Sequence, residues 1–171
     1  MAEAKSSRSG SRIRLKPAPY LIIIVLIIAI SAMSAFAVMS DNSIHGLTLR
    51  FYGSVTRSCD MAGPIPVLSF VLPAVTVYSS ASLTTSLTHV TFSLAADGVQ
   101  VGIANGGDSS FDPGHSVAYS LTFNNPTLDP HSQPLTSQIA LTVNAQVTAG
   151  LYSSPATASD SQLIHFSSPP C

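Results

Sequence analysis

Histidine, cysteine and the carboxylates carry most of the chemistry of protein sites, and this sequence offers few useful arrangements of them. The chain has five histidines: His45, His89, His115, His131 and His165. No two are i, i+4 partners and no cysteine lies near one, so the ligand spacing of a metal site is missing. A Ser/His/Asp triad can be composed from any chain this rich in serine, but the G-x-S-x-G turn of hydrolases is absent. We therefore predict no catalytic, cofactor-binding or metal-binding residue, and expect that the protein is not an enzyme.

One histidine stands out by its neighbours. In Asp112-Pro113-Gly114-His115 the Pro-Gly pair suits the central positions of a type II turn, which places Asp112 near His115. A histidine beside a carboxylate can titrate near neutral pH. We name Asp112 and His115 as a candidate ligand or pH-responsive turn, and an exposed turn histidine as the simpler interpretation. The stretch 105–108 (NGGD) offers two oxygen ligands for calcium without the acidic spacing of calcium loops, and is interpreted as a turn.

The two cysteines, Cys59 and Cys171, lie far apart in the sequence. Outside the cytoplasm they can oxidise. A bond between them would close a loop of about 112 residues (171 minus 59) and, in the chain-entropy model, stabilise the fold by roughly 4–5 kcal/mol. An intermolecular bridge and two free thiols are the alternatives, so the sequence predicts a Cys59–Cys171 disulfide without excluding them.

The compartment is set by an apolar run near the N-terminus. Residues 20–39 carry no charge, and 20 helical residues at 1.5 Å each span a hydrocarbon core of roughly 30 Å. Five of the seven basic residues precede this run and none follows until Arg50. By the positive-inside rule we predict a basic cytoplasmic tail (1–19), a transmembrane helix (20–39), a linker (40–46) and an extracytoplasmic domain (47–171). The expected location is the plasma membrane, with a single pass.

Two other interpretations of the apolar run stay open. In a cleaved signal peptide, 21–30 would be the hydrophobic region and Ala35-Phe36-Ala37 the cleavage site. A class III signal, as in archaeal type IV pilins and archaellins, would place Lys16-Pro17-Ala18-Pro19 at the scissile bond, where two prolines lock the backbone. Both leading interpretations, anchor and cleaved signal, export the C-terminal part.

The exported part has the period-2 pattern of strands throughout. Apolar residues alternate with polar ones in 47–55, 90–94, 117–123 and most clearly 139–147. Asp97-Gly98 between two such runs predicts a hairpin. The run 67–78 is expected to form two short strands broken at Pro73, and 163–166 a last edge strand. We predict a mainly β fold: an antiparallel, immunoglobulin-like β-sandwich of about seven strands after the single helix.

The charged residues of the exported part indicate which classes of partner it can bind. Residues 58–171 contain no Lys or Arg but six acids: Asp60, Asp97, Asp108, Asp112, Asp129 and Asp160. Nucleic-acid binding needs basic residues facing phosphate, so we exclude it. Charged residues make up only 9% of the chain, and a strand-rich surface of low charge favours protein partners.

Residues 75–123 resemble the LEA14-like domain, also called the water-stress and hypersensitive-response domain. The resemblance rests on Asp97-Gly98-Val99, Gly102 and Pro113-Gly114, which fall where the family has a hairpin, a glycine and a Pro-Gly loop. The Asn-Pro that follows an early strand of the family is replaced here by Tyr78-Ser79-Ser80-Ala81. The resemblance implies a non-enzymatic immunoglobulin-like sandwich linked to stress tolerance, often on one N-terminal membrane helix.

Three functions follow as expectations. The first is a membrane-anchored extracytoplasmic β-sandwich protein that serves as a structural or interaction subunit of a cell-envelope or membrane assembly. The second is a stress-protective module of LEA14-like type. A filament subunit similar to type IV pilins is a further alternative to the first. The last, an exported enzyme or metal carrier, would require bound metal in the purified protein.

Overall fold

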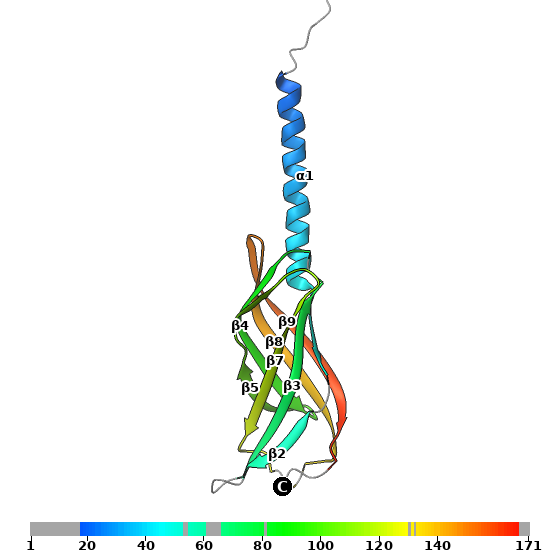
Figure 1. The fold of residues 1–171 in the computed structure, drawn as a ribbon, viewed down its shortest axis with the longest axis vertical. Coiled ribbons are helices and arrows are strands. Elements are labelled where there is room, and N and C mark those ends of the chain that lie inside the picture. The colour runs from blue at the N-terminus through cyan, green and yellow to red at the C-terminus, as the bar shows by residue number, and fades with distance from the viewer. Residues whose placement is uncertain are drawn as a thin grey trace, which may run out of the picture. The chain divides into compact units, whose positions relative to one another are not determined.

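A computed structural model describes residues 18–52, 55–60, 66–80, 82–129, 131 and 133–167 (Figure 1). The chain divides into two compact units, Met1–Phe36 and Ala37–Cys171. The fold is mainly β, with one N-terminal apolar helix and antiparallel sheets, which confirms the predicted class. Most of the predicted cytoplasmic tail lies outside the described residues.

The helix α1 runs from Ala18 to His45, so it continues through residues 40–45, where the sequence predicted a linker. Tertiary contacts explain the extension. Ser40, Ser43 and Ile44 are buried in the second unit, and the Ser43 hydroxyl donates to the carbonyl of Met39 one turn back, at 2.7 Å. Because a serine can satisfy its hydroxyl inside a helix in this way, its polar character does not end the helix here.

Nine strands are found among the described residues, in two sheets. The first sheet contains β1 (Leu47–Phe51), β2 (Thr56–Asp60), β3 (Val67–Ser79) and β7 (Ser116–Asn125). The second contains β4 (Thr85–Ala96), β5 (Val99–Asn105), β6 (Ser109–Phe111), β8 (Thr136–Ala149) and β9 (Tyr152–His165). The expected number of about seven is therefore corrected to nine, because two segments of weak alternation, β2 and β6, also pair.

In each sheet one long strand has a single long partner on one edge and two shorter strands on the other. β7 pairs with most of β3, so β1 and β2 share the other edge of β3. In the same way β8 pairs along β4, and β5 and β6 share its second edge. β3 is continuous through Pro73, where two short strands were expected, and it absorbs the proline with an irregular register between Leu72 and Val75.

The last strand is longer than expected. The sequence predicted an edge strand over 163–166, but β9 begins at Tyr152 and pairs with the whole of β8. None of the side chains of β9 is fully buried. Its first half is rich in Ser and Ala and lacks the alternation of apolar and polar residues by which a strand is recognised in a sequence. Every second residue of β8 is buried, as its clear alternation predicted.

One hydrophobic core lies between these strands. It draws side chains from both sheets, with Phe51, Phe70, Phe92 and Phe123 among its largest fully buried members. Each such side chain stabilises the fold by about 1.5–3 kcal/mol when it leaves water. The core therefore holds the two sheets together as one unit.

Polar side chains join the two sheets where their edges meet. On one side, Asp160 of β9 accepts a hydrogen bond from the backbone N–H of Phe51 in β1 at 3.2 Å, and Gln162 donates to the carbonyl of the same residue. On the other side, Asn125 of β7 donates to the carbonyl of Val101 in β5 at 2.7 Å. Strand-edge groups that lack a neighbouring strand are thus satisfied by side chains.

The register fixes which turns lie at which end of the second unit. Thr85 pairs with Ala149 at one end of the β4–β8 ladder, and Ala96 pairs with Ile139 at the other. Asp97 and Gly98 have φ of 50° and 80°, the left-handed conformations that a two-residue hairpin of type I′ requires, so the predicted hairpin is confirmed.

Candidate functional site

The predicted turn Asp112-Pro113-Gly114-His115 is present. The backbone N–H of His115 donates to the carbonyl of Asp112 at 3.0 Å, and Gly114 has a φ of 78°, as position i+2 of a type II turn requires. The Asp112 carboxylate accepts a hydrogen bond from the Thr84 hydroxyl at 2.8 Å, whereas Nδ1 of His115 lies 3.3 Å from the carbonyl oxygen of Pro113. The turn brings the two residues together, but their side chains bond to Thr84 and to the Pro113 carbonyl, and the pH response stays a prediction.

The turn at 105–108 has a structural use. The Asp108 carboxylate accepts a hydrogen bond from the backbone N–H of His89 at 3.1 Å. His89 has a φ of 52° and lies where the β4–β8 register shifts between Thr88 and Thr91, so Asp108 supports a bulge. Within the part of the chain that the structure describes, no group of three or more His, Cys, Asp or Glu side chains could hold a metal ion.

The predicted disulfide concerns β2. Cys59 lies in this strand opposite Leu68, and the structure records it in a disulfide. Cys171, the sequence's other cysteine, lies outside the described residues. The pairing Cys59–Cys171 therefore stays a prediction.

Two ionisable side chains are perturbed by their burial. Burial raises the pKa of Tyr119, with a small addition from Asp108, while the hydrogen bond to Ser109 at 2.7 Å opposes the rise. Burial lowers the pKa of Arg57, whose guanidinium lies 4.1 Å from the ring centroid of Phe166 and donates to the carbonyl of Pro134 at 2.8 Å. Both side chains join separate segments of the β domain, which is a structural role.

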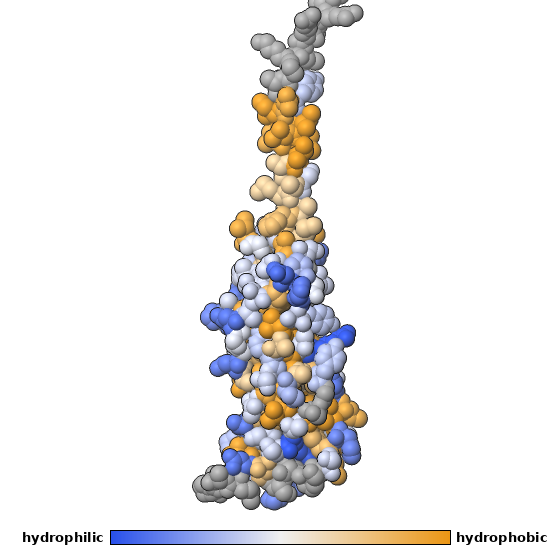
Figure 2. Space-filling model, viewed as in Figure 1, coloured by the Kyte–Doolittle hydropathy of each residue, from blue (hydrophilic) through white to orange (hydrophobic). Residues whose placement is uncertain are grey.

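The apolar part of α1 is the feature that most clearly needs a partner. Ten large apolar side chains between Tyr20 and Ile30 are each 53–62% exposed. Figure 2 shows a hydrophobic band on this part of the helix. Among the described residues this helix alone is long and apolar enough to cross a membrane, a test that a signal sequence also passes. Length and composition thus leave both an anchor and a signal sequence open.

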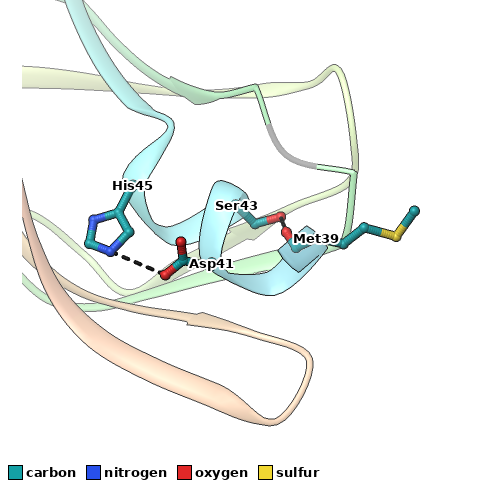
Figure 3. A network of polar contacts seen from close by, with 4 residues as sticks. All are labelled: Met39, Asp41, Ser43 and His45. Atoms are coloured by element: carbon teal, nitrogen blue, oxygen red, sulfur yellow. Dashed lines mark hydrogen bonds and ion pairs between the residues drawn. The ribbon is translucent and has the colours of Figure 1, made fainter. Parts of the chain in front are cut away.

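The end of α1 belongs to the β unit and carries a small polar network (Figure 3). Oδ1 of Asp41 lies 3.3 Å from Nε2 of His45, and both side chains are largely exposed. On the buried side, the Ser79 hydroxyl donates to the carbonyl of Ser43 at 2.9 Å. The boundary of the compact unit, between Phe36 and Ala37, lies one residue before the predicted signal cleavage position after Ala37.

A groove lies beside this helix end. Ala37, Asp41, Ile44 and His45 of α1 line one side, and residues 152–154 of β9 line the other, around a volume of about 320 Å³. This groove was not predicted, because β9 was expected to begin eleven residues later, at residue 163. The start of β9 therefore lies next to the last residues of the apolar run.

The sequence matches no known family and no curated protein. Solved structures that it resembles include a protein from Archaeoglobus fulgidus, at 7% identity and a TM-score of 0.37, covering 66% of this chain and 95% of that one. Another is a Bordetella pertussis protein described as ApaA, at 14% identity and a TM-score of 0.40, covering 71% and 94%.

Proposed function

We propose that this chain is a membrane-anchored β-domain protein, with its N-terminus in the cytoplasm and residues 47–171 outside, and that it serves as a structural or interaction subunit of a cell-envelope or membrane assembly. The observation that carries the proposal is the exposed apolar surface of α1. Ten large apolar side chains that are each more than half exposed would cost on the order of 10 kcal/mol or more to keep in water.

A lipid bilayer is the covering that this surface fits. The helix is apolar on every side, whereas a helix packed against one protein face has a polar side. A helix pairs the backbone groups of its interior within the segment, as a hydrocarbon environment demands. The basic residues that precede it and the absence of Lys and Arg from 58–171 support the proposed orientation.

The residue types on the surface of the β domain support the interaction role. Its exposed strand faces are mostly Ser, Thr and Ala with few charged residues, as along β9, whose only ionisable side chains after Tyr152 are Asp160 and His165. The side chains singled out as chemical candidates are used instead in turns and in a bulge, as for Asp112 and Asp108. A sheet surface of low charge on a tether suits lateral association with other envelope proteins.

Two alternatives remain as proposals of lower rank. An LEA14-like protective module on an immunoglobulin-like sandwich rests on the motif at 97–99 and the Pro113-Gly114 turn, and predicts a monomeric protein. A pilin-like filament subunit would use the apolar helix to assemble with copies of itself, and predicts helical filaments.

Extraction from the native membrane in a mild detergent tests the proposed role. Native mass measurement of the extracted material should give a complex of fixed stoichiometry that contains the full-length chain. A full-length chain that is monomeric at every detergent concentration would refute the subunit role and favour the protective module. Filaments of this chain alone would favour the pilin-like alternative.

A further inference from the structure

The turn between β8 and β9 has an unusual residue for a hairpin turn, a large apolar side chain. Ala149 pairs with Tyr152, so the loop consists of Gly150 and Leu151 alone. Gly150 has a φ of 63°, as the first central residue of a type II′ turn requires. Leu151 takes the second position, where small or polar residues dominate, and its side chain is 91% exposed. A tight two-residue turn thus exposes a large aliphatic side chain.

A matched turn in the same unit behaves differently. The β4–β5 hairpin is also closed by two residues, Asp97 and Gly98, and its tip is polar. The β4–β8 register places this polar tip at the end of the ladder marked by Ile139, and Leu151 at the opposite end, marked by Thr85. The two hairpin tips therefore lie at opposite ends of the β4–β8 ladder, and the polar turn 112–115 lies at the same end as Leu151, because Thr85 also pairs with Phe111.

The end that carries Leu151 is the end where the apolar run of α1 finishes. Tyr152 and Ala37 line the same groove, and Figure 3 shows the β8–β9 hairpin passing beside the last turns of the helix. Ala37 lies within the apolar run 20–39, and the two residues after it, Val38 and Met39, are 59% and 45% exposed. All these residues belong to one compact unit.

We propose that the hairpin tip Leu151-Tyr152 enters the membrane interface beside α1 and gives the β domain a second contact with the bilayer. This rests on the proposed function, because it takes residues 20–39 to lie in the membrane. The side chains suit the position: leucine partitions into the acyl region, and tyrosine is enriched where acyl chains meet headgroups. Tyr152 is half exposed, so its ring is free to reach that layer. The contact orients the β domain against the membrane instead of leaving it on a loose tether.

The absence of tryptophan from the chain allows a direct test. Three single-tryptophan variants of the full chain are made: Leu151→Trp at the tip, Ile24→Trp in the apolar run, and Leu163→Trp as a control. Leu163 is 74% exposed on the same strand, 12 residues from the tip, which is about 40 Å along an extended strand. Each variant is reconstituted into phosphatidylcholine vesicles with or without bromine-labelled acyl chains, and tryptophan emission is recorded.

The proposal expects Leu151→Trp to have blue-shifted emission and to lose most of it in the brominated vesicles, as Ile24→Trp does, while Leu163→Trp keeps its emission. Quenching of Ile24→Trp alone would overturn the hairpin contact and leave the anchor in place. Quenching of Leu163→Trp to the same degree as Leu151→Trp would also overturn it, because the domain would then lie flat on the bilayer. An unquenched Ile24→Trp would refute the anchor itself, and the hairpin contact with it. Circular dichroism of each variant checks that the β fold is kept.

Discussion

Replacing Asn125 should weaken the β domain far more than replacing the asparagine beside it. Asn125 is 8% exposed at the end of β7 and makes four hydrogen bonds. Its Nδ2 donates to the Val101 carbonyl at 2.7 Å, and its Oδ1 accepts from the Thr127 N–H, the Thr127 hydroxyl and the Leu128 N–H at 2.8, 2.7 and 3.1 Å. The side chain thus joins the two sheets and shapes the loop that follows.

The expected loss can be worked from these contacts. In Asn125→Ala, water can replace the two bonds to exposed Thr127, but the groups of Val101 and Leu128 are partly or wholly shielded. At about 1–1.5 kcal/mol for each bond that water cannot restore, the free energy of unfolding should fall by about 2–3 kcal/mol. The control, Asn124→Ala, removes one exposed bond to the Ser69 hydroxyl and should cost about 0.5 kcal/mol or less.

Urea unfolding of the full chain in detergent micelles, followed by far-ultraviolet circular dichroism, measures both variants. With a slope of about 2 kcal/mol/M for a domain of this size, the midpoint for Asn125→Ala should fall by about 1–1.5 M. A shift equal to that of Asn124→Ala would refute the assignment of Asn125 as the clamp between the sheets.

Asn125→Asp separates the donor from the acceptors. It keeps the three acceptor bonds but sets a carboxyl against the Val101 carbonyl, and burial there should raise the carboxyl pKa in the folded state. The stability of this variant relative to the native chain should then be greatest at acidic pH and fall as the pH rises through that pKa. A pH-independent difference would contradict this reading.

Three further predictions follow from single contacts. An added Cβ at Gly106 would lie 2.8 Å from atoms of Phe92 and Val90, so Gly106→Ala should lower the free energy of unfolding by about 1–3 kcal/mol, whereas Gly107→Ala, with open space around it, should be near neutral in the same urea titration. Because burial raises the pKa of Tyr119, its share of the stability is present below the ordinary tyrosine pKa and is lost as the pH rises through the folded-state value. Tyr119→Phe should therefore make alkaline unfolding less steep, at a cost of about 1 kcal/mol near neutral pH, and an unchanged alkaline transition would be the contrary result. If Cys59 pairs with Cys171, reduction should raise the mass of the monomer by two hydrogens without changing its oligomeric state. A covalent dimer that reduction converts into monomers would show an intermolecular bridge instead.

The parts of the fold that could be predicted from the sequence are those that depend on local residue types and their spacing. Alternating apolar residues in β4 and β8 point to the core, so period-2 patterning was sufficient for them. Asp97-Gly98 has a local conformational cause and was also recognised. The uncharged run of α1 needed only its length.

The missed features depend on contacts between distant segments. The helix continues through Ser40 and Ser43 because they are buried against the β domain, although serine is neither apolar nor a strong helix former. The first half of β9 is a strand because β8 offers it a complete edge, not because of its own side chains. The hydrogen bonds that join the sheets, such as those of Asp160 and Asn125, and the place of Leu151 at the helix end follow from strand order, which the sequence does not state.

The most direct test of the membrane-anchored account is the intact mass of the protein recovered from carbonate-washed membranes of its native cell, compared with the mass in the soluble exported fraction. The account predicts that the protein stays in the washed membranes and that its mass includes the whole apolar run 20–39. A chain that begins at Val38 and is found in the soluble fraction would contradict it, since residues 20–37 would then have served only as an export signal.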